Sequence, residues 1–172
     1  MRTTGTSQCN SGRSECRPPA ESCNLQDDDC DGRCDEESPT LGCRIGVHRG
    51  YTSGFHIYST SSNLISSQGS SVEVSNYFEL YQDSVPDTSA VYLCLDQMQR
   101  ASLSTSRNCS NGQAPLEHLG YWANSSQCGA RPLYSLVQPE SGNTFYTIDP
   151  AEVDNAMETW SYQNLGIVGY VW

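Results

Sequence analysis

The chain of 172 residues contains no lysine, and all nine of its basic residues are arginines. Schiff-base and P-loop chemistry, which both need a lysine amine, are therefore excluded. Twenty acidic residues give a net charge of −11, whereas binding nucleic acid phosphates requires clustered cations. No apolar run approaches the roughly 18 residues that mark a membrane-spanning helix. We therefore expect neither nucleic acid as a partner nor a membrane span.

Motifs of enzyme active sites are missing as well. Gly-x-Ser-x-Gly, His-Glu-x-x-His and Cys-x-x-Cys do not occur in the sequence. The three histidines, His48, His56 and His118, are scattered along the chain, and such histidines are usually structural. The sequence predicts that the protein is not an enzyme.

Cysteine, in contrast, is abundant, with nine residues and no redox motif to explain them. This density is typical of an oxidising compartment, so we expect a secreted or cell-surface protein with disulfide bonds. The first quarter of the chain holds Cys9, Cys16, Cys23, Cys30, Cys34 and Cys43. These can pair among themselves, for example Cys23 with Cys30. Of the remaining Cys94, Cys109 and Cys128, one must be free, bond across segments or link two chains.

The N-terminal quarter divides into two parts. Residues 1–22 hold almost no large apolar side chain and are predicted to be a cysteine-containing arm. Residues 23–43 are rich in aspartate, and Asp27, Asp29 and Asp31 alternate just before Gly32. Alternating carboxylates followed by a glycine are typical of a Ca²⁺ loop, in which the seventh ligand position uses a backbone carbonyl and the ninth an acidic residue. A solvated, self-repelling acidic run is the alternative.

A calcium site is the interpretation we favour for this loop. Its twelfth position is Ser38, so the last carboxylate must come from Glu36 or Glu37. The predicted ligands are Asp27, Asp29, Asp31, Arg33 (through its carbonyl), Asp35, Glu36 and Glu37. Residues 23–36 resemble the Asp-rich metal-binding motif of bacterial surface and secreted proteins, Cys-Asn-Gly-x-Asp-Asp-Asp-Cys-Asp-Gly-x-x-Asp-Glu, and depart from it at Leu25 and Cys34. A cluster of carboxylates alone suits a hard cation such as calcium.

Residues 44–172 read as an all-β domain, because short apolar or aromatic runs alternate with Ser, Gly, Asn and Pro turns. One helix is predicted over Pro150–Thr159, with Asp149 as its N-cap and a proline in its first turn. The segment Gly54–Thr60 resembles Gly142–Ile148, and a fainter copy lies at 100–105. A second block recurs at 76–80, 118–123 and 160–165, each time followed by an apolar strand.

Three copies of roughly forty residues, each with about four strands, predict a β-trefoil. The predicted repeats run over about 44–95, 96–130 and 131–172. A propeller would need more blades, and a sandwich would not require threefold similarity.

The third copy carries a resemblance to a known family. Residues 132–152 resemble a secreted bacterial repeat family of unassigned function, with the pattern Pro-Leu-Tyr-Arg-x-x-x-Pro-x-x-Gly-x-His-Phe-Tyr-Thr-x-Asp. The similarity extends from Val47 to Trp172. The histidine of the signature is present only in the first copy, as His56, with Ala101 and Thr144 at the equivalent positions. The resemblance implies a lectin-like trefoil that binds rather than catalyses, because such domains are often appended to secreted hydrolases or surface proteins.

Carbohydrate binding is the predicted function. Ten tyrosines and three tryptophans offer flat rings for stacking on a sugar, and Ser- and Asn-rich loops offer hydrogen bonds. Tyrosines within strands, namely Tyr58, Tyr92, Tyr146 and Tyr170, are predicted to fill the core. Loop aromatics are the predicted ligand contacts together with the signature histidine, namely Tyr51, His56, Tyr81 and Trp122.

We therefore expect a lectin-like module with a structural calcium loop that binds glycans or a cell-surface polysaccharide. The alternative is a structural subunit of an extracellular filament or coat that self-associates through its N-terminal arm.

Overall fold

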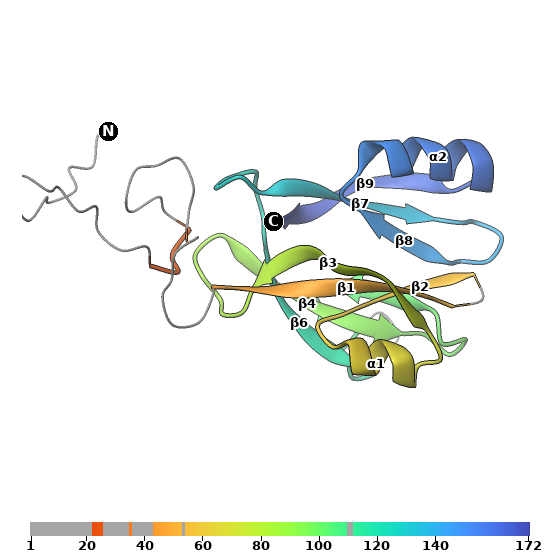
Figure 1. The fold of residues 1–172 in the computed structure, drawn as a ribbon, viewed down its shortest axis with the longest axis horizontal. Coiled ribbons are helices and arrows are strands. Elements are labelled where there is room, and N and C mark those ends of the chain that lie inside the picture. Colours follow the sequence, from red (N-terminus) through yellow and green to blue (C-terminus); the bar gives the residue numbers. More distant parts are fainter. Residues whose placement is uncertain (1–21, 26–34, 36–42, 53, 110–111) are drawn as a thin grey trace, which may run out of the picture.

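The computed structural model describes residues 22–25, 35, 43–52, 54–109 and 112–172 (Figure 1). The elements are β1 (Arg44–Thr52), β2 (Phe55–Ser59), α1 (Ser62–Ser67), β3 (Ser71–Tyr81), β4 (Thr88–Leu95), β5 (Ala101–Ser104), β6 (Glu117–Ala123), β7 (Arg131–Val137), β8 (Thr144–Thr147), α2 (Pro150–Trp160) and β9 (Gln163–Val171). The described part of the chain is thus mostly β-sheet, which confirms the predicted class.

The strands form one nine-stranded antiparallel sheet. They fall into three groups, β1–β3, β4–β6 and β7–β9, and in each group the first strand pairs with both others. Tyr81 and Tyr121 join β3 to β6, and Ala123 and Tyr170 join β6 to β9. Because each group holds three strands where the prediction required about four, the pairing does not confirm a trefoil, and the three repeats stay a prediction.

Of the two helices, the sequence predicts one and not the other. α2 begins where predicted, because the Asp149 side chain accepts a hydrogen bond from the backbone N–H of Ala151 at 2.9 Å. The sequence does not predict α1, because six residues rich in serine show no apolar periodicity and only Ile65 is buried. In the part of the chain that the structure describes, neither helix is long and apolar enough to cross a membrane.

The main core draws large side chains from all three groups of strands. Val47, Phe78, Leu93, Trp122, Leu133 and Val171 are among its buried members. Of the four strand tyrosines predicted to fill the core, Tyr58 and Tyr146 are buried, whereas Tyr92 and Tyr170 are only partly buried. The Tyr58 hydroxyl donates to the carbonyl oxygen of Tyr146 at 2.7 Å and accepts from its N–H at 2.9 Å. The Tyr146 hydroxyl accepts from the N–H of Leu103 at 3.0 Å, so the two tyrosines connect β2, β8 and β5.

Disulfide bonds are present, as the cysteine content predicts. Cys23 pairs with Cys43, so the suggested link between Cys23 and Cys30 is wrong. Cys94 at the end of β4 pairs with Cys109, which follows it by 15 residues. In the chain-entropy picture, closing a loop of that size contributes about 3 kcal/mol to folding. Cys128 is also disulfide-bonded, so it is not a free thiol.

Candidate functional site

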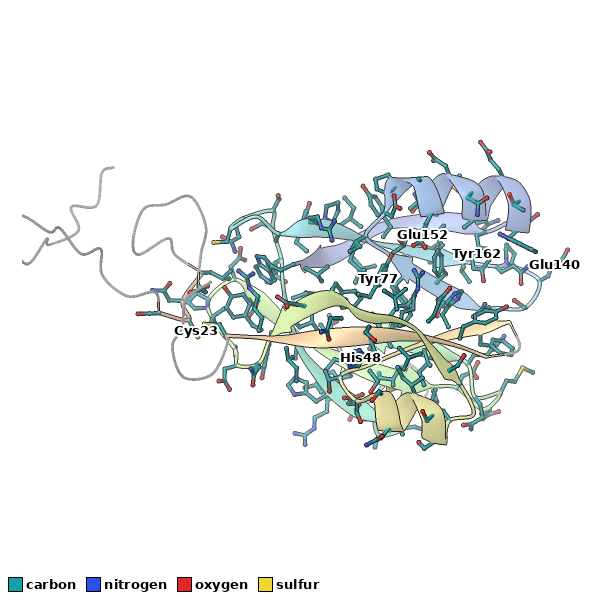
Figure 2. All side chains as sticks on the ribbon, in the orientation of Figure 1. Cys23, His48, Tyr77, Glu140, Glu152 and Tyr162 are labelled. Atoms are coloured by element: carbon teal, nitrogen blue, oxygen red, sulfur yellow. A yellow bond between two sulfur atoms is a disulfide. The ribbon has the colours of Figure 1, made fainter. Side chains whose placement is uncertain are left out.

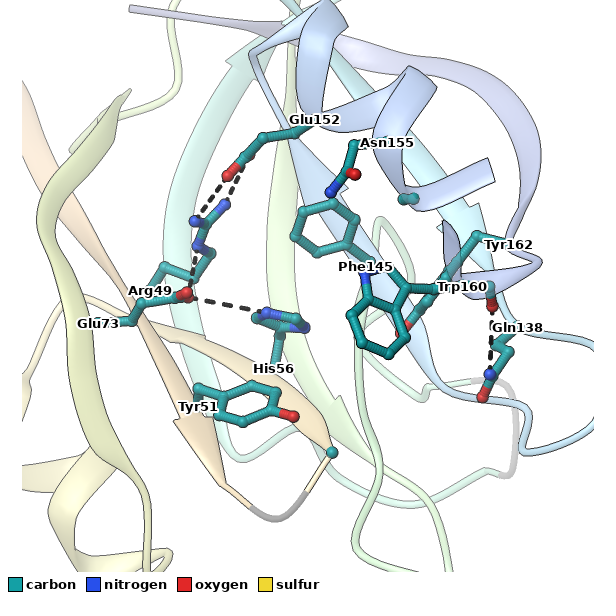
Figure 3. A pocket seen from close by; sticks show the side chains of 12 residues that line it. Arg49, Tyr51, His56, Glu73, Gln138, Phe145, Glu152, Asn155, Trp160 and Tyr162 are labelled. Atoms are coloured by element: carbon teal, nitrogen blue, oxygen red, sulfur yellow. Dashed lines mark hydrogen bonds and ion pairs between the residues drawn. The ribbon is translucent and has the colours of Figure 1, made fainter. Parts of the chain in front are cut away.

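A cleft of about 460 Å³ opens between the first and the third group of strands (Figure 3). β1, β2 and β3 form one wall, and β8, α2 and the segments next to them form the other. Its lining residues are Arg49, Tyr51, Gly54, His56, Glu73, Gln138, Phe145, Glu152, Asn155, Ala156, Trp160 and Tyr162. Five of these carry aromatic rings, and the rest are mostly charged or amide side chains.

Arg49 forms the floor of the cleft, where its side chain is only 6% exposed. Both terminal nitrogens of its guanidinium donate to the Glu152 carboxylate at 2.9 Å, and its Nε donates to Oε2 of Glu73 at 2.9 Å. The guanidinium also lies over the Tyr77 ring, 4.2 Å from its centroid. This two-pronged pairing matches the planar fork of arginine to a carboxylate. Residues from β1, β3 and α2 are thereby held in one geometry.

Glu152 is satisfied on both carboxylate oxygens. Besides Arg49, the hydroxyl of Tyr77 donates to it at 2.7 Å (Figure 2), and that of Thr147 donates at 2.5 Å. Partial burial raises the pKa of Glu152, but the hydrogen bonds from Arg49, Thr147 and Tyr77 outweigh it and lower the pKa to about 2. Burial has the opposite effect on Arg49 and lowers its pKa. The hydrogen bonds with Glu152, together with nearby Tyr58 and Tyr77, outweigh burial, so the pKa of Arg49 is raised above its usual value. The pair is therefore ionised at every physiological pH.

His56 lies on β2 between two aromatic rings. Its ring centroid is 5.0 Å from that of Tyr51 and 4.7 Å from that of Phe145. Its Nε2 is 3.7 Å from Oε2 of Glu73, and its buried Nδ1 has no hydrogen-bond partner among the described residues. Burial lowers the pKa of His56 to about 4; nearby Glu73 opposes this shift and Arg49 adds to it. At neutral pH the imidazole is uncharged, so it brings no positive charge to the cleft.

The mouth of the cleft exposes two aromatic side chains. Tyr51 is 43% exposed and Trp160 is 61% exposed. Buried Asn143 braces the mouth, because its Nδ2 donates to the carbonyl oxygen of Gly54 at 2.6 Å and to the Tyr162 hydroxyl at 2.7 Å. Gly54 has a φ of 101°, a conformation that glycine adopts without strain. The turn between β1 and β2 is thus tied to the third group of strands.

The structure separates the four predicted ligand contacts into two pairs. Tyr51 and His56 lie together in the cleft. Tyr81 and Trp122 do not, since they are 1% and 5% exposed, and the expectation that they lie on exposed loops is wrong. Both belong to strands and face the interior; at Gly169, an added Cβ would lie 2.6 Å from the Trp122 ring. Trp122 packs in the main core, whereas Tyr81 packs with Leu25 and Cys43 in a separate small core, so burial keeps both rings from a ligand in solution.

Several cleft residues were missed by the sequence reasoning. Trp160 ends α2, Phe145 lies on β8, and Arg49 and Glu152 are 103 residues apart in the sequence. Trp160 could have been found, because it directly follows the helix predicted over Pro150–Thr159 and is the one aromatic side chain of α2. No local pattern indicates the ion pair.

The predicted calcium loop lies largely outside the described residues. Of its seven predicted ligands, Asp27, Asp29, Asp31, Arg33, Glu36 and Glu37 lie outside them. Asp35 is buried, and its carboxylate accepts hydrogen bonds from the N–H groups of Asn24 and Leu25 at 3.0 and 3.1 Å and from the Tyr81 hydroxyl. Over the residues that the structure describes, no group of three or more His, Cys, Asp or Glu side chains is placed to hold a metal ion.

Comparison with known proteins identifies the family. Residues 46–172 match the family described as Domain of unknown function (DUF5648), and the matched region includes every residue that lines the cleft. No curated protein and no solved structure matches the chain. The expectation of a family without assigned function is thereby confirmed. With about three quarters of its length matched, the chain belongs to the DUF5648 family.

Proposed function

We propose that the protein is a carbohydrate-binding, lectin-like module, secreted or at the cell surface, and that its sugar site is the cleft between the first and third groups of strands. The observation that carries the proposal is the pair of exposed rings, Tyr51 and Trp160, at the mouth of a polar cavity. Aromatic faces stack on the apolar face of a pyranose. Gln138 and Asn155 in the same lining carry amides, which have two donor and two acceptor positions each. They can therefore bind sugar hydroxyls in addition to the bonds that Gln138 makes with Trp160 and Ser141 and the bond that Asn155 accepts from Thr159.

The geometry favours binding over catalysis. A glycosidase needs a carboxylic acid that still carries its proton near neutral pH. Glu152 cannot fill this role, because its pKa of about 2 keeps it ionised near neutral pH. Its oxygens also already accept hydrogen bonds from Arg49, Tyr77 and Thr147. A rigid, fully paired floor instead presents the rings and amides above it in a fixed arrangement, which lowers the entropy lost when a ligand binds.

A glycan array followed by calorimetric titration of the best glycan tests this proposal. Tyr51→Ala and Trp160→Ala should each weaken binding about tenfold, since one lost stacking contact is worth about 1.4 kcal/mol. Leu116→Ala is the control, because Leu116 is also exposed but does not line the cleft. Absence of binding to every glycan, or binding that both aromatic variants retain, would refute the proposal. A polymer seen by size-exclusion chromatography would favour the filament alternative.

We also propose that the three groups of strands are a threefold repeat closed as in a trefoil. Two features support it. The predicted repeats align Tyr58, Leu103 and Tyr146. The Tyr58 hydroxyl contacts β8 and the Tyr146 hydroxyl contacts β5, and the series ends at Leu103 because leucine lacks a hydroxyl. The third strands also meet pairwise, since backbone hydrogen bonds of 2.7 and 3.2 Å between Glu79 and Trp172 complement the bridges of β6 to β3 and β9. A crystal structure with β3 and the chain end apart would contradict this closure.

The calcium loop is a third proposal, and we assign the ion a structural role at the junction of arm and domain. The disulfide between Cys23 and Cys43 closes the loop at its base. Asp35 is fastened to Tyr81, and Leu25 packs with Tyr81 in the same small core. A bound Ca²⁺ would neutralise the repulsion among the remaining carboxylates, so its binding would add to folding stability.

A further inference from the structure

The cleft carries an excess negative charge. Its ionised side chains are Arg49, Glu73 and Glu152, while His56 is neutral at pH values well above 4. The Glu152 carboxylate accepts hydrogen bonds from both terminal nitrogens of Arg49, and Oε2 of Glu73 accepts one from its Nε. Two carboxylates thus share one guanidinium, and the cleft has a net charge of about −1.

The unbalanced charge resides on Glu73, which a ligand can reach. Its side chain is 41% exposed at the wall formed by β3. Among the described residues, Arg49 and His56 contact the Glu73 carboxylate, and both do so at Oε2. Oε1 is thus the acceptor that a ligand can use. Arg49 cannot bind an anionic ligand in its place, because it is buried and each of its three nitrogens already donates to a carboxylate.

A shallow groove of about 490 Å³ continues from the cleft on the other side of Trp160. It is lined by Gln138, Pro139, Glu140, Thr159, Trp160, Ser161 and Gln163. Gln138 and Trp160 line both cavities, so a chain of sugars leaving the cleft passes over the exposed indole. The only ionised side chain in this lining is again acidic, Glu140. Every accessible charge along the path is therefore negative.

We propose that the ligand is an oligosaccharide of amino sugars with protonated amines, as in a deacetylated polysaccharide, which extends from the cleft across Trp160 into the groove. One ammonium group binds Oε1 of Glu73 and another lies near Glu140. The aromatic rings of Tyr51 and Trp160 add to this preference, because ring faces attract cations as well as stacking on sugars. An acidic glycan would be repelled by Glu73 and would find no accessible cation among the described residues of the cleft to pair with its own charge. This inference rests on the proposed carbohydrate-binding function.

Calorimetry with matched tetrasaccharides tests the inference. We would compare tetramers of glucosamine and of N-acetylglucosamine at about pH 5.5, where the amines are protonated and His56, with a pKa of about 4, remains mostly neutral. Acetylation removes the charge and leaves the sugar ring unchanged. We expect the amine-bearing tetramer to bind about tenfold more tightly or better, with the advantage shrinking as salt increases from about 20 to about 500 mM.

Charge-neutral variants locate the effect. Glu73→Gln should abolish the advantage of the amine-bearing tetramer while binding of the acetylated one persists, and Glu140→Gln should reduce it for the tetramer but not for the monosaccharide. Glu158→Gln is the matched control, because Glu158 is exposed on α2 and lines neither cavity. Thermal melting confirms that each variant is folded.

The outcomes separate the two levels of the proposal. Failure of every glycan on the array and of both tetramers to bind overturns the carbohydrate-binding function itself. Binding of glycans without preference for the amine, or a preference that Glu73→Gln leaves intact, overturns the amino sugar inference and leaves the function standing.

Discussion

Replacement of Glu152 by glutamine should destabilise the fold strongly, because it removes the charge that pairs with buried Arg49. The glutamine side chain cannot accept at all the positions that Arg49, Tyr77 and Thr147 now occupy, since one of its two terminal atoms is a donor. Removing one partner of a buried ion pair costs about 3–5 kcal/mol. The Glu152 side chain is about one third exposed, so we discount this to about 2–4 kcal/mol.

Urea unfolding at neutral pH, followed by tryptophan fluorescence, measures this loss. For a chain of this length it corresponds to a fall in Tm of roughly 4–16 °C. Glu158→Gln on the exposed side of α2 is the control and should change the free energy of unfolding by less than about 0.5 kcal/mol. A Glu152→Gln variant as stable as this control would refute the claim that the ion pair joins the first and third groups of strands.

The pH dependence provides an independent check of the same reasoning. Folding lowers the pKa of Glu152 from 4.5 to about 2. The stabilisation is therefore complete above about pH 4.5 and is lost as the pH falls toward 2. After a discount for solvent screening, we expect this loss to be about 2 kcal/mol in the wild type. Because a glutamine at this position does not titrate, the difference between wild type and variant should shrink over this window; a constant difference would contradict the assignment.

Three further predictions concern other parts of the molecule. Folding lowers the pKa of His56 from 6.5 to about 4, so the free energy of unfolding of the wild type should fall by about 2–3 kcal/mol as the pH falls from 6.5 to 4. In urea titrations over that range, a His56→Phe variant should lose less stability. Tyr81→Phe removes a hydroxyl that donates to buried Asp35 and should cost about 1–3 kcal/mol by urea unfolding; an unchanged midpoint would argue against this anchor. A chelator should lower the Tm of the wild type, because Ca²⁺ at about 100 times its Kd contributes about 2.7 kcal/mol to the free energy of unfolding. A variant with Asp27, Asp29 and Asp31 changed to Asn should not respond to the chelator. An unchanged wild-type Tm, with no bound Ca²⁺, would contradict the calcium proposal.

Features with local causes were predictable from the sequence. α2 follows from the cap at Asp149 and the proline after it, both within one turn of the helix start. The all-β class of residues 44–172 follows from turn residues between short apolar runs. α1 escaped notice because its six residues offer a serine cap but no apolar stripe. Part of the cleft was also found, since Tyr51 and His56 lie side by side in the β1–β2 hairpin, where sequence neighbours become spatial neighbours.

The sequence alone determined the chemistry that the protein has at its disposal: no lysine, an acidic balance, oxidisable cysteines and many flat rings. Only the tertiary structure decided which rings meet solvent. In a strand, adjacent side chains point to opposite faces, so a shift of one residue exchanges buried for exposed positions. Tyr81 and Trp122 fell inside, Trp160 outside, and Arg49 met Glu152 across 103 residues. Such encounters depend on how distant strands pack, which no local pattern encodes.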